Sequence, residues 1–185
     1  MESYLKTLES HCTPKRYEHS IRVSKEAIKL AGIYNADCKQ VEKAGILHDI
    51  AKNHNPSSLL ELGVRCEEFD ECWNQYPAVW HAFVGPLLIE HEFPGEAEAI
   101  QTLVQYHTTG SPNMSMEEAI IFVADFIEPG RKDDRSHFAN IAYDNLNKAV
   151  ACITKQTIQK LESKNNPIHP FTLECWQWYS RFLED

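Results

Sequence analysis

The sequence predicts an all-α fold, a single-domain helical bundle, on three observations. Apolar residues recur at the helical spacing of three to four residues along most of the chain. Helix-capping signals divide these stretches: Thr13 precedes Pro14, and Ser115 precedes Glu118 by three residues. No stretch shows period-two alternation between hairpin turns. A length of 185 residues suits one continuous core, so residues 1–185 are predicted to form one domain.

The capping signals and the apolar spacing place the helices in chain order. Thr13 and Pro14 begin the second helix, Asp37 with Gln40 resembles a capping box for the third, and the box at Ser115 begins the eighth. Helices are expected at residues 3–11, 14–34, 38–53, 57–63, 66–74, 78–92, 96–108, 116–127, 137–163 and 171–183. We expect the metal-ligand core within 16–131, with the C-terminal helices 137–183 completing the bundle.

The composition argues against several classes of function. There are 27 acidic and 18 basic residues, for a net charge of -9, which is unsuited to binding a nucleic-acid polymer or an anionic membrane. The first residues, MESYLKTLESH, lack the apolar core of a signal peptide, and no apolar run reaches the length of a membrane span. We expect a cytoplasmic protein. The six cysteines are scattered without a Cys-x-x-Cys pair, so neither a zinc ribbon nor a disulfide framework is indicated.

Six side chains of metal-binding types fall on apolar helix faces. In VEKAGILHDIAK, the stripe of Val41 and Ala44 ends in His48 and Asp49, where another aliphatic residue would be expected. Asp125 lies in the almost wholly apolar run AIIFVADFI. Burying an unpaired carboxylate costs on the order of several kcal/mol, so a cation or a hydrogen-bonded counter-charge is expected beside each aspartate. The other candidates are His19, His81 and His107, each aligned with aliphatic residues of its own helix.

These six residues together predict a buried two-metal site. One histidine on an apolar face is usually a core residue bonded to backbone carbonyls, but four histidines and two aspartates are too large a polar load for that interpretation. One or two divalent cations would satisfy them together. Because Asp49 has two oxygens, it can bridge two ions. The first ion would take His19, His48, Asp49 and Asp125, and the second would take Asp49, His81 and His107. Nitrogen and oxygen ligands suit iron, manganese, cobalt or zinc.

Groups suited to phosphate lie beside these candidates. Lys52 follows His48 by four residues and Arg22 follows His19 by three, although a solvated surface charge would look the same. The Thr-Thr-Gly segment 108–110 offers hydroxyls, backbone amides and a glycine that lets an anion approach. Two cations with open positions favour phosphoester or phosphoanhydride hydrolysis. The substrate-binding candidates are Arg22, Lys52, Thr108, Thr109, Gly110 and Arg131, and the catalytic candidates are Asp49, Lys52 and Asp125.

The candidate ligands and their neighbours resemble a known family. The order His19, His48-Asp49, Asp125 is similar to the signature of the HD superfamily of metal-dependent phosphohydrolases. The segments RYEHSIRV, GILHDIAK, WHAFVG, YHTTG, ADFIEPGR and PIHPFTLE, within residues 16–174, resemble the YqeK family in order and spacing. This resemblance implies a bacterial enzyme that cleaves diadenosine tetraphosphate symmetrically to two ADP by a metal-bridging hydroxide. It also implies two divalent or mixed-valence metal ions, iron, held by the six candidate ligands.

The chain departs from the family in one loop, and several alternatives stay open. After YHTTG it has Ser111-Pro112-Asn113-Met114, where the family commonly has arginine, proline, glycine and methionine, so one cation near the polyphosphate is missing. The alternatives are a nucleotidase or a guanosine-polyphosphate hydrolase and, from another class, a non-catalytic nucleotide-binding regulatory module. The intact ligands argue against the last. A homodimer is also left open, and His169 of the PIHP segment receives no role.

Overall fold

Helices joined by turns and loops make up the computed structural model, which describes residues 1–96 and 98–184 and contains no strand among them. The all-α prediction is confirmed. The helices are α1 (Glu2–His11), α2 (Pro14–Tyr34), α3 (Cys38–Leu47), α4 (Pro56–Glu61), η1 (Glu67–Phe69), α5 (Asp70–Gln75), α6 (Pro77–Glu92), α7 (Gln101–Gln105), α8 (Met116–Ile127), α9 (Ser136–Asp144), α10 (Leu146–Glu162), α11 (Pro170–Tyr179) and η2 (Ser180–Leu183). Among the described residues, no helix has both the length and the apolar character that a membrane crossing requires.

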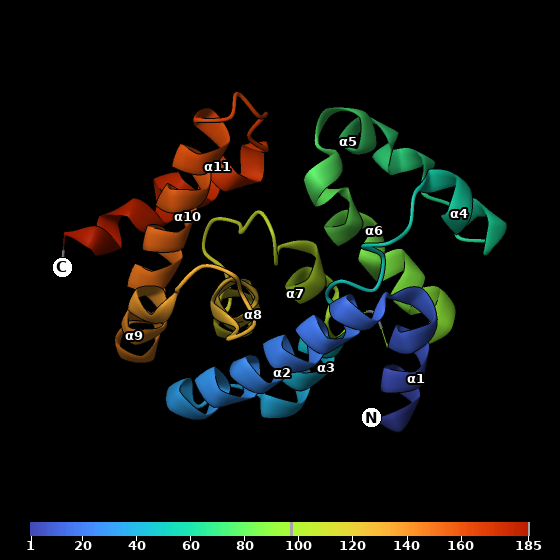
Figure 1. Cartoon of the computed structure of the whole chain (residues 1–185), viewed down its shortest axis with the longest axis horizontal. Coiled ribbons are helices and arrows are strands. Elements are labelled where there is room, and N and C mark those ends of the chain that lie inside the picture. Colours follow the sequence, from blue (N-terminus) through green and yellow to red (C-terminus); the bar gives the residue numbers. More distant parts are fainter. Residues whose placement is uncertain (97, 185) are drawn as a thin grey trace.

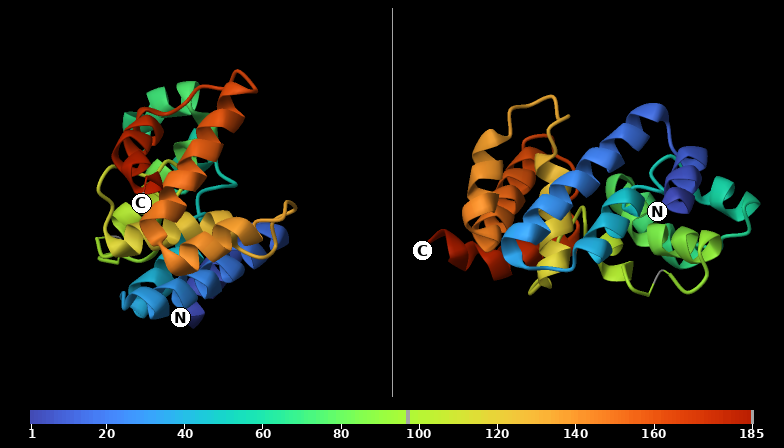
Figure 2. Two further views of the ribbon diagram at one scale, coloured as in Figure 1. Left: turned by 90° about the vertical axis from the view of Figure 1, so that its left-hand side faces the viewer. Right: turned by 90° about the horizontal axis from the view of Figure 1, so that it is seen from below.

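Helix α8 is the centre of the bundle. It packs against α2, α3, α7, α9 and α10, which explains why its residues from Ala119 onward are all apolar except Asp125 (Figure 1). Seen from below, α8 in yellow lies against the blue α2, with α9 and α10 in orange on its other side (Figure 2). The capping box predicted at its start is present: the Ser115 hydroxyl accepts from the Glu118 amide at 3.2 Å, and the Glu118 carboxylate accepts from the Ser115 amide at 2.8 Å.

The third helix ends six residues earlier than expected. Helix α3 stops at Leu47, and residues 48–53 form turns in which the amides of Ile50 and Lys52 donate to the carbonyl three residues before, at 3.0 and 2.9 Å. The carbonyl of Gly45 contacts the ring Nδ1 of His48 at 2.8 Å. The ring N–H of His48 thus donates to a backbone carbonyl in the last turn of α3. Beyond this residue the backbone continues in tighter turns of the 3₁₀ type. The two ligand candidates His48 and Asp49 therefore lie at the end of a helix and not within one.

Two other expected helices differ from the structure. The predicted helix 137–163 is interrupted at Asn145, whose extended backbone and side chain, which accepts from the Lys148 amide at 3.0 Å, begin a new helix α10. The predicted helix 96–108 is reduced to α7, with turns on both sides; its residue 97 lies outside the described residues. The predicted helices 66–74 and 171–183 each divide into a 3₁₀ turn and an α-helix.

The C-terminal helices are tied to the N-terminal half by specific contacts. The Tyr34 hydroxyl donates to the Ala142 carbonyl at 2.6 Å, and the Tyr143 hydroxyl donates to the Glu26 carboxylate at 2.6 Å. Both contacts join α2 to α9. Helix α10 then packs along α8, α9 and α11, so the C-terminal helices cover one side of the central helix (Figure 1).

Candidate metal centre

The structure brings all six predicted metal ligands together from five parts of the chain. His19 comes from α2, His81 from α6 and Asp125 from α8, while the turns after α3 and α7 supply His48-Asp49 and His107. Five of the six residues are buried. The Asp125 side chain is 19% exposed, and in the apolar run 119–127 the half-buried residues are Asp125 and Phe126.

The two oxygens of Asp49 face different pairs of histidines. Oδ2 lies 3.4 Å from Nε2 of His48 and 3.5 Å from Nε2 of His19. Oδ1 lies 3.1 Å from Nε2 of His81 and 3.6 Å from Nε2 of His107. One carboxylate is therefore shared between two sets of imidazole nitrogens.

Two overlapping groups of these residues, which share His48, are close enough together to hold a divalent ion. Asp125 Oδ1 lies 3.0 Å from Nε2 of His19 and 3.8 Å from Nε2 of His48. The ligand atoms of His19, His48 and Asp125 all lie within 4.8 Å of one another, as do those of His48, Asp49 and His107. His81 lies beside the second group, with its Nε2 3.2 Å from that of His107 and 3.1 Å from Oδ1 of Asp49. Imidazoles and carboxylates without thiolate form a donor set for a divalent transition metal.

Contacts outside the cluster aim the histidine rings inward. In His48 and His107, Nδ1 lies 2.8 and 2.6 Å from the backbone carbonyl three residues earlier, and in His19 it lies 3.1 Å from Oε1 of Glu128. Carbonyl and carboxylate oxygens can only accept, so Nδ1 carries a proton in each ring; the neutral ring then has a free lone pair on Nε2 for a metal, whereas the protonated ring donates through Nε2 to the aspartates. This arrangement is the one that orients imidazole ligands in metal proteins.

The electrostatic surroundings favour the ionised aspartate and the neutral histidine that metal binding requires. Burial alone would raise the pKa of Asp49, but the charge of His48 and hydrogen bonds from the surrounding rings hold it well below its ordinary value. Burial likewise opposes ionisation of Asp125, yet the hydrogen bond from His19 and the charge of Arg131 lower its pKa. Burial lowers the pKa of His81 to about 3, so that this ring is neutral at pH 7.

A family model described as "HD domain" matches residues 16–130, which include all six ligand candidates. The chain belongs to the HD domain family. It is 35% identical over 172 residues to "Bis(5'-nucleosyl)-tetraphosphatase, symmetrical" of Staphylococcus aureus (strain NCTC 8325 / PS 47), an alignment that covers 90% of this chain and 87% of that one. It is 34% identical over 178 residues to the protein of the same name from Bacillus subtilis (strain 168), covering 96% of each.

A solved structure agrees with this membership. The crystal structure of a predicted HD superfamily hydrolase involved in NAD metabolism from Clostridium acetobutylicum superposes with a TM-score of 0.83 at 30% identity, covering 98% of this chain and 97% of that chain. The resemblance to HD phosphohydrolases expected from the sequence is confirmed.

Two residues of the HD-domain centre were missed in the sequence. Arg16 Nη1 lies 2.5 Å from Asp49 Oδ2, and Glu128, which is buried, contacts His19. Arg16 precedes His19 by three residues and Glu128 follows Asp125 by three, so helical spacing from the ligands could have found both.

The predicted phosphate-binding cations lie at the edge of the HD-domain centre. Lys52 Nζ lies 3.2 Å from both ring nitrogens of His81, and burial lowers its pKa. Arg131 donates to the Asp125 carboxylate. Arg22 donates through Nε to Glu128 Oε2 at 2.6 Å.

The expectation for Thr109 and Gly110 is corrected by the structure. Both residues are buried, and the Gly110 amide donates to the carbonyl of Tyr106 at 2.8 Å, so it is not free for an anion. Gly110 has φ +65°, and a Cβ there would lie 2.6 Å from Sγ of Cys175. The glycine permits close approach of α11, not of an anion. In the divergent loop that follows, Asn113 has φ 52°, a conformation that asparagine tolerates in place of glycine.

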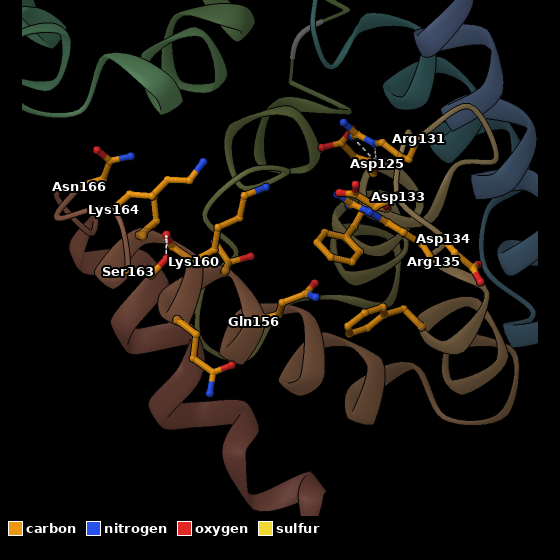
Figure 3. Close-up of a pocket in the computed structure, with 15 residues that line it drawn as sticks. Asp125, Arg131, Asp133, Asp134, Arg135, Gln156, Lys160, Ser163, Lys164 and Asn166 are labelled. Carbon is orange, nitrogen blue, oxygen red and sulfur yellow. Dashed lines mark hydrogen bonds and ion pairs between the residues drawn. The ribbon is translucent and has the colours of Figure 1, made fainter.

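Two polar cavities lie beside the HD-domain centre. One, of about 710 Å³, is bounded by Asp125 and Arg131 at one end and by Lys160 and Lys164 of the α10 terminus at the other (Figure 3). The second, of about 360 Å³, includes Arg16, His19 and Arg22. The two share Arg131, Asp133 and Arg135.

Proposed function

We propose that this HD-domain protein is a metal-dependent phosphohydrolase of nucleoside polyphosphates, a symmetrical bis(5'-nucleosyl)-tetraphosphatase that cleaves diadenosine tetraphosphate to two ADP. The observation that carries the proposal is the position of Asp49, whose two oxygens face two different pairs of histidine nitrogens. A carboxylate so placed suits two cations side by side, the arrangement used for phosphoryl transfer. The named activity of the relatives at 34% and 35% identity supports the substrate.

The ligand atoms divide between two proposed ions. His19, His48, Asp49 and Asp125 would hold the first, and Asp49, His81 and His107 would hold the second. When bound, two such ions supply an activated water and neutralise charge on the phosphoryl group. We propose iron as the metal because the resemblance to the family implies it; the nitrogen and oxygen donors without thiolate suit iron, as they also suit manganese, cobalt and zinc.

The protein's own cations would bind and orient the polyphosphate. With a net charge of -9, the chain must meet a phosphate chain with locally placed positive charge. The large cavity provides it: Arg131, Arg135, Lys160 and Lys164 line the space beside Asp125, together with Asp133 and Asp134 (Figure 3). Lys52, beside His81, would donate to an oxygen of the phosphate under attack.

The test is product analysis with purified, metal-loaded protein. Diadenosine tetraphosphate should yield ADP alone, because attack at an inner phosphorus makes ADP both product and leaving group. Equal amounts of ATP and AMP would contradict symmetrical cleavage. A panel with nucleoside monophosphates and guanosine polyphosphates separates the rival hydrolases, and tight nucleotide binding without turnover on any of them would favour the regulatory module. Metal analysis of the same samples tests for iron.

A further inference from the structure

A small apolar cavity lies between the start of α6 and the connection from α10 to α11. Its volume is about 250 Å³, and its walls include Tyr76, Val79, Leu161 and Pro167. A cavity that encloses a whole drug-sized ligand usually measures roughly 300 to 1,000 Å³, so this one suits a single ring system of a longer molecule. The segments that form it, near residues 76–79 and 157–172, lie far apart in the sequence (Figure 1).

The cavity adjoins the metal centre on the side of His81 and His107. Its wall contains Thr108, the residue directly after His107. It also contains Ala78, whose carbonyl lies 3.3 Å from the Nζ of Lys52, and the same Nζ lies 3.2 Å from His81. If part of a ligand fills this cavity, a phosphate chain attached to that part has only a short distance to span to the metal centre.

Two polar side chains in the cavity wall have hydrogen-bonding capacity to spare. The Thr108 Oγ1 is buried and has no hydrogen-bond partner within residues 1–96 and 98–184. A buried hydroxyl without a partner is costly, and rotation of the Thr108 side chain towards the cavity would let a ligand atom satisfy it. His169 accepts through Nδ1 from the Phe171 amide at 3.2 Å, so the ring proton is on Nε2, which can donate. Burial lowers the pKa of His169, and the ring is neutral at pH 7.

The wall also offers aromatic edges. Tyr76 and His169, both part of the wall, meet edge to face with ring centroids 4.8 Å apart, and Phe83, which is not part of the wall, packs behind His169 with ring centroids 5.0 Å apart. An apolar slot framed by aromatic rings, with one hydroxyl and one N–H donor, matches a flat heterocycle that carries both acceptor nitrogens and an amino group.

We propose that this cavity binds one nucleobase of the substrate, an adenine, with Thr108 and His169 as its hydrogen-bonding residues. The inference rests on the proposed function for the identity of the ligand. It gives the PIHP segment the role of base recognition and assigns the second nucleotide to the cationic cavity beside Asp125, so that the two halves of a symmetrical substrate are bound differently.

The experiment measures binding of adenosine, which carries no phosphate and needs no metal, by calorimetry on the full chain. Thr108→Val removes the hydroxyl and keeps the shape, and His169→Asn keeps a residue that can cap α11 while removing the ring donor. Each variant should weaken adenosine binding by about tenfold, the effect of one lost hydrogen bond. Binding of inorganic tripolyphosphate to the metal-loaded protein should not change. Thr102→Val, an exposed threonine on α7, is the matched control and should bind adenosine as the wild type does.

The outcomes separate this inference from the proposed function. Wild-type protein that binds adenosine in a Thr108-dependent and His169-dependent way, yet hydrolyses no nucleoside polyphosphate, would leave the base site standing and remove the hydrolase. Symmetrical hydrolysis combined with equal adenosine affinity in wild type, Thr108→Val and His169→Asn would overturn the base site alone. Failure of the wild type to bind adenosine at millimolar concentration would also overturn it. Melting curves check that each variant is folded; Thr108→Val loses no hydrogen bond in the free protein and should melt at the wild-type temperature.

Discussion

Oε1 of Glu128 lies 3.1 Å from Nδ1 of His19, and the contact is buried on both sides. The other Glu128 oxygen accepts from Nε of Arg22 at 2.6 Å and from the Gly130 amide at 2.7 Å. Arg22 and the turn after α8 thus fix the carboxylate, and the carboxylate fixes the orientation of the histidine ring. Arg22 therefore helps to position His19 through Glu128, separately from any contact that it makes with phosphate.

Replacing Glu128 by glutamine should weaken metal binding by roughly 10 to 100-fold, because the charged acceptor that orients His19 is lost. Equilibrium dialysis followed by metal analysis measures the effect. Glu18→Gln is the matched control, since Glu18 also contacts Arg22, at 3.8 Å, but is exposed. If both variants kept the same metal affinity as the wild type, Glu128 would have no part in positioning the ligand.

His81→Ala should lower the metal content from about two ions per chain towards one, since the second proposed ion has only three protein ligands. The first ion keeps its own set of ligands, so the variant should remain folded. His91→Ala, an exposed histidine on the same helix, is the control and should retain the wild-type content. Two ions at full occupancy in folded His81→Ala would exclude His81 from the centre.

Lys52→Met keeps the aliphatic stem and removes the charge beside His81. We expect kcat/KM for diadenosine tetraphosphate to fall roughly 10 to 1000-fold while the bound metal is unchanged, because the lysine would stabilise the phosphoryl group in the transition state. Lys39→Met, at an exposed position on α3, should be without effect. Wild-type kinetics in Lys52→Met would leave this lysine as a structural donor to Ala78 and His81 only.

Gly110→Ala should lower the free energy of unfolding by roughly 2 to 4 kcal/mol, measured by urea denaturation, through backbone strain and overlap with Cys175. Gly95 has φ +82° and nothing within 4 Å of an added Cβ, so Gly95→Ala reports the strain alone. In a Cys175→Ala background the nearest contact of that Cβ would be the Cys175 Cβ at 3.3 Å, and the penalty should shrink towards the Gly95 value. An equal penalty in both backgrounds would show that the contact with Cys175 is not the cause.

The cluster of candidate ligands could be predicted from the sequence because each residue interrupts a run of apolar residues at helical spacing, and that signal is local. Glu128 and Arg16 lie one helical turn from Asp125 and His19, a spacing that marks them as neighbours of the site, but their contacts with His19 and Asp49 of other elements are visible only in the structure. Gly110 was misinterpreted for the same reason: its close neighbour, Cys175, belongs to α11. The early end of α3 depends on a ring-to-carbonyl contact, which apolar spacing does not reveal.

The contact between Gly110 and Cys175 indicates how much of the chain is needed for the metal centre to fold on its own. All proposed metal ligands lie within the HD-domain match, residues 16–130. The turn after His107, however, rests on α11, and α2, which carries His19, is held by hydroxyl contacts to α9. A fragment cut at residue 130 would keep every ligand and lose the supports that hold two of the ligand-bearing segments. The residues that define the family are therefore a shorter set than the residues that make the centre rigid.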